Sequence, residues 1–67
     1  MLKIKDDVDL SKLKKFGFIK SWSGFWVITD KDNYIIASIN PITYELDTDD
    51  ELIISQLRLA GLLDNVD

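Results

Sequence analysis

The absence of both cysteine and histidine from a chain of 67 residues sets the main limit on how this chain can fold. A chain this short buries only about 60% of the surface that its unfolded form exposes, so a single core supplies little stability. Small proteins usually compensate with disulfides, a structural metal, self-association or very efficient packing. Without cysteine no disulfide can form, and a zinc site lacks its usual ligands. The sequence therefore predicts a fold that depends on packing, with self-association as a further source of stability.

The composition places the chain among globular proteins. Its hydrophobic fraction of 46% is too high for a disordered chain, even though 30% of the residues are charged. The first ten residues include Asp6 and Asp7 where a signal peptide needs an apolar stretch, and no apolar run reaches membrane-spanning length. We expect one small α+β domain over residues 1–67, a cytoplasmic location and no membrane contact.

The segment 9–18 has the pattern of a short helix near the N-terminus. Asp9 is a suitable N-cap, and Gly17 is suited to the left-handed position that ends a helix. The three apolar residues Leu10, Leu13 and Phe16 share one side, which predicts that this side packs on the core.

A second helix is predicted near the C-terminus. The sequence from Thr48 to Glu51 matches a capping box with Thr48 as N-cap, and Gly61 followed by Leu62 matches a Schellman stop. The apolar stripe expected to face the core consists of Leu52, Ile53, Leu57, Leu59 and Ala60. Leu62 or Leu63 is expected to pack on the core, and the remaining tail to fray.

Four strands are predicted between the helices, over residues 18–22, 25–30, 34–40 and 43–46. Turn residues separate them at Ser23-Gly24, at residues 30–33 and at Asn40-Pro41. The predicted fold class is α+β, with a short N-terminal helix, a four-stranded antiparallel meander and a C-terminal helix packed on one sheet face. A division of the helices between both faces stays open.

Alternation along these strands assigns each residue to one of two faces, if Trp22 pairs with Phe25, Thr29 with Tyr34 and Ile39 with Tyr44. The expected core face holds Ile19, Trp26, Ile28, Ile35, Ala37, Ile39, Tyr44 and Leu46. The expected second face holds Phe18, Lys20, Trp22, Phe25, Val27, Thr29, Tyr34, Ile36, Ser38 and Glu45. This second face is too aromatic for a surface that contacts only water.

The residue types present argue against catalysis. Lack of histidine and cysteine removes the commonest general base and the most nucleophilic side chain. The acidic residues fall in turns and helix caps, where water and backbone amides stabilise the ionised form. We expect no enzyme activity, no cofactor and no small-molecule substrate.

Two acidic clusters resemble calcium loops only in part. The loop beginning at Asp30 has Ile35 where an EF-hand needs glycine and Pro41 where it needs the closing glutamate. In the cluster formed by Asp47, Asp49 and Glu51, the glycine position falls on Leu52. Turn and cap roles explain both clusters, so no metal site is predicted.

The second sheet face suggests a protein interface. We expect Trp22, Phe25, Val27, Tyr34 and Ile36 to form it, with Trp22 and Tyr34 as anchors, since buried aromatic residues dominate interface energetics. The expected partner is a second copy of the chain, or else another protein. Packing within the core is a simpler explanation of the same aromatic residues.

A nucleic-acid-binding module is the alternative function. Segment 12–26 holds five of the seven aromatic residues together with Lys12, Lys14, Lys15 and Lys20. Such a mixture can stack unpaired bases and neutralise phosphates, although the chain has a net charge of −4. A third and weaker reading is a mimic of nucleic acid built from the acidic residues at positions 47–51.

The helical pattern of residues 9–18, the short aromatic hairpin and the acidic-capped helix ending in LRLAGLL resemble small proteins encoded in prophages of Gram-positive bacteria. The resemblance spans most of the chain and implies a bacterial cytoplasmic setting. That group has no established function, so the resemblance assigns no activity and no site residue.

Overall fold

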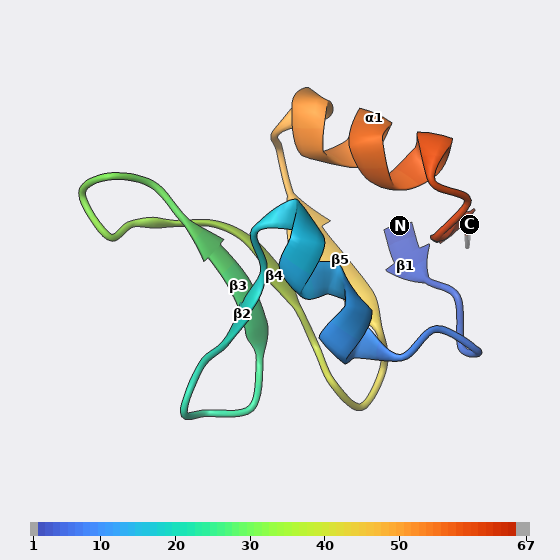
Figure 1. Cartoon of the computed structure of the whole chain (residues 1–67), viewed down its shortest axis with the longest axis horizontal. Helices are drawn as coiled ribbons and strands as arrows, with labels where there is room; N and C mark the ends of the chain where they lie inside the picture. Colours follow the sequence, from blue (N-terminus) through green and yellow to red (C-terminus); the bar gives the residue numbers. More distant parts are fainter. Residues whose placement is uncertain (1, 66–67) are drawn as a thin grey trace.

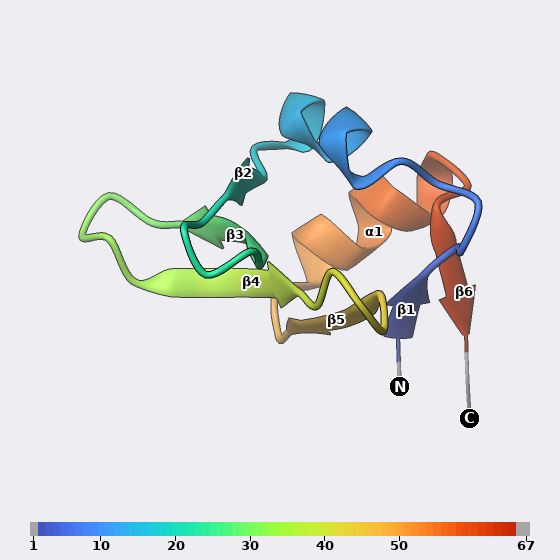
Figure 2. The same ribbon diagram turned by 90° about the horizontal axis from the view of Figure 1, so that it is seen from below.

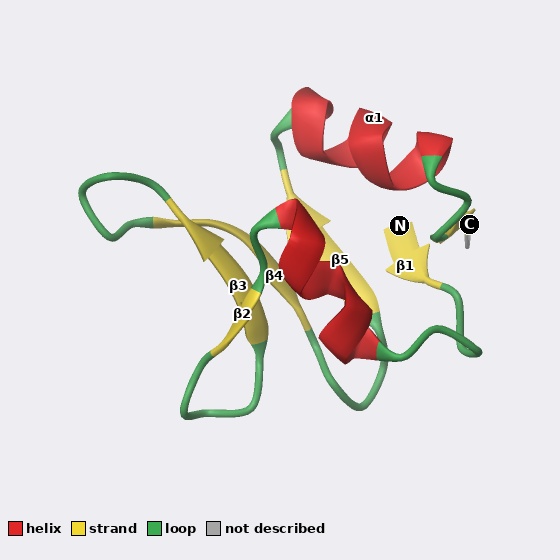
Figure 3. Ribbon diagram, viewed as in Figure 1, coloured by secondary structure: helices red, strands yellow, loops and turns green. Residues whose placement is uncertain are grey.

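The structure is a computed structural model that describes residues 2–65. In this part of the chain, two short helices accompany one six-stranded antiparallel sheet (Figures 1 and 3). Its strand order is β2-β3-β4-β5-β1-β6. The elements are β1 (Leu2–Ile4), the 3₁₀ helix η1 (Leu10–Phe16), β2 (Ile19–Lys20), β3 (Trp26–Thr29), β4 (Ile35–Ile39), β5 (Glu45–Thr48), α1 (Glu51–Leu59) and β6 (Leu63–Asn65). The predicted fold class was therefore wrong, because strands and not helices are the first and last of these elements.

The two missed strands, β1 and β6, depend on partners that are distant in sequence. Leu2 pairs with Leu46 of β5 on one side and with Asn65 of β6 on the other. Three residues are too few to show an alternating pattern, so these strands leave almost no local signal. Since β5 and β6 both run antiparallel to β1, they are parallel to each other, and α1 forms the crossover between them.

Helix η1 has the predicted ends. The Asp9 carboxylate accepts hydrogen bonds from the Ser11 backbone amide at 3.0 Å and from the Ser11 hydroxyl at 2.8 Å. Gly17 has φ +99°, and its amide donates to the Lys14 carbonyl. Leu10 and Leu13 are buried and Phe16 packs against them in the core, as predicted.

Helix α1 begins later than the capping box predicts. Asp50, not Thr48, is the N-cap, and its side chain accepts from the backbone amides of Leu52 and Ile53. Thr48 belongs to β5, and its hydroxyl donates to the Ile36 carbonyl at 2.7 Å. The hydroxyl that was expected to cap the helix is therefore hydrogen-bonded to the neighbouring strand β4.

The C-terminal end of α1 is the predicted Schellman motif. Gly61 has φ +75° and donates to the Arg58 carbonyl, while the Leu62 amide donates to the Leu57 carbonyl. The predicted apolar stripe is only partly correct. Ile53, Ile54 and Leu57 are buried, whereas Leu52 and Leu59 are 66% and 88% exposed.

Both helices pack on the same face of the sheet (Figure 2). One cluster of buried side chains joins η1, α1 and the strands: Ile4, Leu10, Leu13, Phe18, Trp26, Ala37, Ile39, Leu46, Ile53 and Leu57. Leu62 and Leu63 are half-buried against it, as predicted. The expected fraying of the tail is wrong for residues 64 and 65, which pair with β1 as part of β6, and residues 66 and 67 lie outside the described part. The helices are therefore not divided between two faces.

Strand β2 has a register one residue away from the predicted one. Ile19 pairs with Val27 and Lys20 with Trp26. A shift of one residue exchanges the two faces of a strand. Accordingly, Phe18 is fully buried in the core and Ile19 is 58% exposed, the opposite of the prediction.

Strand β4 contains a second error in face assignment. The pairing of β3 with β4 changes register between Ile28 and Thr29, so that Ala37 faces Ile28 but Ile35 faces Thr29. This irregularity leaves Ile36 as the extra residue of a β-bulge and moves Ile35 to the side opposite the core. Ile35 is 63% exposed, although alternation without a bulge predicts that it is buried.

The corrected β2 register predicts unequal effects for two neighbouring substitutions. Phe18→Ala should cost about 3–5 kcal/mol of folding free energy, because it empties a fully buried site, whereas Ile19→Ala should change it by less than about 1 kcal/mol. Urea unfolding followed by circular dichroism, at the lowest usable protein concentration, measures both. An equal loss in the two variants would contradict the register.

Candidate interaction surface

The sheet face turned away from both helices, here called the outer face, is not covered by any element among residues 2–65 (Figure 2). Register places five apolar residues on its β2–β4 side, here called the apolar half: Ile19, Phe25, Val27, Ile35 and Ile36. Four of them are exposed, by 37% to 63% of their surface. A chain this small thus presents neighbouring branched and aromatic side chains to water.

Val27 lies at the centre of the apolar half. It pairs with Ile19 on β2 and with Ser38 on β4, and it is only 5% exposed. Because no helix covers this face, the side chains of its neighbours must exclude water from it. The outer face therefore has a small packed centre of its own, separate from the core under the helices.

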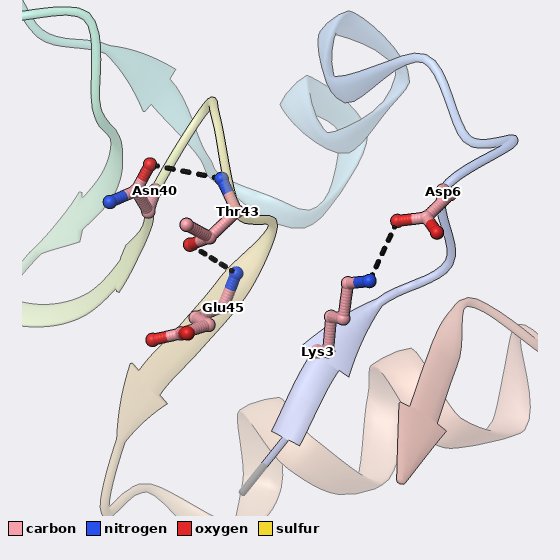
Figure 4. A network of polar contacts seen from close by, with 5 residues as sticks. All are labelled: Lys3, Asp6, Asn40, Thr43 and Glu45. Carbon is pink, nitrogen blue, oxygen red and sulfur yellow. Dashed lines mark hydrogen bonds and ion pairs between the residues drawn. The ribbon is translucent and has the colours of Figure 1, made fainter. Parts of the chain in front are cut away.

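The β5-β1-β6 side of the outer face is charged. Register places Lys3 there between Glu45 and Asp64, with Asp47 further along β5, and these four residues are here called the acidic half. Lys3 Nζ also forms an ion pair of 2.9 Å with Asp6 (Figure 4). That hydrogen bond, aided by the charges of Asp6, Asp64 and Glu45, raises the pKa of the Lys3 ammonium above its ordinary value of 10.5.

Polar side chains fix the turns that border the apolar half. Asn40 Oδ1 accepts from the Ile42 and Thr43 amides, and Thr43 Oγ1 accepts from the Glu45 amide (Figure 4). In the β2–β3 turn, the Ser21 hydroxyl donates to the Phe25 carbonyl at 2.9 Å, and Gly24 adopts φ +98°. The turns are therefore held in defined conformations by their own side chains.

The β2–β3 and β4–β5 turns lie next to each other. A Cβ atom at Gly24 would come within 3.9 Å of the Pro41 side chain. Trp22 and Ile42, one on each turn, are 103% and 87% exposed. These two side chains extend the exposed apolar surface beyond the end of β3.

The structure brings together only part of the predicted interface. Phe25 and Ile36 lie exposed on the outer face, and Val27 lies there but is buried. Trp22 is on the β2–β3 turn, while Tyr34 precedes β4 and pairs with Asp30, which by alternation puts it on the helix side of the sheet. These two intended anchors are thus separated by the length of β3.

Sequence reasoning missed two exposed residues of the apolar half, Ile19 and Ile35. Ile19 follows Gly17, where η1 ends in a left-handed conformation, and Phe18 then points into the core. For Ile35, the sequence signal that could have revealed its exposure was the turn of residues 30–33. Asp30 Oδ1 accepts hydrogen bonds from the Asp32 and Tyr34 amides, and Asn33 has φ +67°. This Asx turn, with its asparagine in the left-handed conformation, fixes which residues of β3 and β4 pair beside it.

The lysines proposed for nucleic-acid binding lie apart from the outer face. Lys12, Lys14 and Lys15 belong to η1, and Lys20 pairs with Trp26, whose side chain faces the core. Lys14 Nζ lies 6.0 Å from the centre of the Trp26 ring, but that ring is 7% exposed and has no free face for a base. The lysines and the exposed Phe25 are therefore on opposite sides of the sheet.

The acidic clusters serve the backbone. Asp30 and Asp50 each accept hydrogen bonds from two backbone amides, and no three acidic side chains among residues 2–65 are grouped in a way that could hold a metal ion.

An open hollow of about 400 Å³ lies between Ile35, Ile36, Asp49 and Asp50. In the described part of the chain, neither helix has the length and apolar character needed to cross a membrane.

Comparison of this chain with protein-family models, with curated proteins and with solved structures finds no match.

The Lys3 ion pair predicts a shift in titration. Asp6→Ala removes the carboxylate that accepts this hydrogen bond and raises the pKa of Lys3, so this pKa should fall toward 10.5. Because the folded pKa lies above the unfolded one, the stabilising contribution of Lys3 is present below pH 10.5 and is lost as pH rises through the folded value. NMR titration of the Lys3 side chain tests this, and an unchanged pKa in the variant would refute it.

Proposed function

We propose that this protein is a non-enzymatic interaction module that associates with a second copy of itself through the apolar half of the outer face. The observation that carries the proposal is the placement of both helices on one face, which leaves Ile19, Ile35 and their neighbours in water on the other. Contiguous exposed apolar surface on a small protein marks an interaction site. Covering it also adds stability that a core of this size lacks.

An interface of standard size would cover a modest share of the surface of this chain. A standard interface buries about 800 Å² on each partner, about a sixth of the 4745 Å² that this chain exposes. The fully exposed Trp22 adds aromatic surface at one end, where a buried aromatic side chain contributes about 150–250 Å², and Phe25, which is 38% exposed, adds a smaller area. The branched residues of β2 and β4 provide the centre of the contact.

The charge pattern favours a protein partner over nucleic acid. The outer face combines its apolar half with Glu45, Asp47 and Asp64, which repel phosphate. The nucleic-acid module remains an alternative for the lysine-bearing side, and salt-dependent retention on a single-stranded oligonucleotide would support it. A cytoplasmic location and a prophage origin stay predictions from the sequence.

A matched pair of charge substitutions tests the proposed surface. Ile19→Lys adds a charge to the apolar half, while Leu59→Lys adds the same charge at a more exposed apolar residue of α1. We expect Ile19→Lys to weaken dimerisation at least tenfold and Leu59→Lys to leave it within twofold. Light scattering over a concentration series measures the dissociation constants.

Two outcomes would contradict the proposal. One is a wild-type chain that stays monomeric up to millimolar concentration. The other is equal weakening by the two substitutions, which would place the contact away from the outer face. Circular dichroism of both variants controls for loss of folding.

A further inference from the structure

We propose that the two copies stack outer face on outer face about a two-fold axis that runs along β3. This inference rests on the proposed self-association and adds its geometry. It follows from the division of the outer face into an apolar half on one side of the sheet and an acidic half on the other.

A two-fold face-to-face dimer of sheets has two limiting arrangements. If the axis runs across the strands, each strand lies over its own copy, so β5, β1 and β6 of the two chains face each other. The acidic half would then face its copy. It carries Glu45, Asp47 and Asp64 against Lys3, three negative charges and one positive, or −2 on each copy.

Stacking the acidic halves would be unfavourable for two reasons. Like charges repel across the interface, and each buried carboxylate would lose its water. Lys3 cannot offset this cost, since its ammonium already pairs with Asp6 at 2.9 Å. The arrangement with the axis across the strands is therefore disfavoured.

An axis along β3 avoids this contact. It places β4 of one copy over β2 of the other, so that Ile35 and Ile36 approach the partner's β2–β3 side. Because β2 is the edge strand of the sheet, β5, β1 and β6 extend past the partner and keep their charges in water. Both arrangements stack the apolar halves on each other, and the charge of the acidic half selects the axis along β3.

With the axis along β3, the same end of the sheet in each copy also lies close to its counterpart in the other. The β2–β3 turn of one copy, with the fully exposed Trp22, lies near the same turn of the other. Ile42 is on the neighbouring β4–β5 turn and adds apolar surface there. The exposed Trp22 is covered in this dimer without belonging to the outer face itself.

The absence of cysteine allows a direct test by cross-linking. Ser23→Cys labels the β2–β3 turn and Lys31→Cys labels the β3–β4 turn, at opposite ends of β3. Trp26 and Thr29, the first and last residues of β3, are about 10 Å apart along the strand and the turns lie beyond them, whereas a disulfide needs Cα atoms closer than about 7 Å. The two variants are oxidised separately and as a mixture, at a concentration where the wild type is dimeric. Ser55→Cys, exposed on α1, controls for random collision.

With the axis along β3, Ser23→Cys alone should form a covalent dimer at least tenfold faster than Ser55→Cys. The mixture should contain no more of the Ser23–Lys31 cross-link than the collision control. A dominant mixed cross-link would place the axis across the strands and overturn this inference while leaving self-association intact. A dimer by light scattering with no cross-link above the control would overturn it as well. A monomer by light scattering would refute the proposed function itself.

Discussion

The protein has enough helix to cover one face of its sheet and no more. Seven residues of η1 and nine of α1 supply Leu10, Leu13, Ile53 and Leu57 to a single core, together with side chains from β1 and β3 to β5. All the described helical structure is used on that side. The properties of the other face follow from this limit, because its apolar residues must be covered by neighbours within the sheet, as Val27 is, or by another molecule.

Strand β1 joins the hairpins of β2 to β5 to the C-terminal strand β6. It lies between β5, which closes the run of hairpins, and β6, which follows α1. Its buried Ile4 contributes to the core, while Lys3 on the other face sits among carboxylates. This three-residue strand thereby contributes to the core and also connects the carboxylates of β5 with that of β6 on the outer face. The contrast between the two halves of that face depends on it.

Local features of the sequence predicted local structure well. The cap at Asp9 and the left-handed residues Gly17 and Gly61 depend on contacts within a few positions, and all three were predicted correctly. Thr48 failed as a cap because its hydroxyl had a better partner twelve residues away, the Ile36 carbonyl. Long-range competition of this kind leaves no trace in a short window of sequence.

Register and strand number were the parts that local reasoning could not supply. The faces of Phe18 and Ile19 exchanged because one residue at the end of η1 shifts the whole of β2, and Ile35 moved because of a bulge. The terminal strands have too few residues for any periodicity. Of the residues proposed for the candidate surface, Phe25, Val27 and Ile36 accordingly share one sheet face, whereas Trp22 and Tyr34 do not lie with them.

The pairing of β1 has a consequence for the order of folding. The hairpins of β2 to β5 join strands that are close in sequence, whereas β1 meets β6 through pairs 59 to 63 residues apart, from Ile4 with Leu63 to Leu2 with Asn65. Closing so long a loop costs entropy before any contact is gained, so we expect these pairs to form late. The apolar half can then assemble while the acidic half is still incomplete. For a chain emerging from the ribosome, early contacts between neighbouring copies would form before Asp64 joins Glu45 and Asp47 on the outer face.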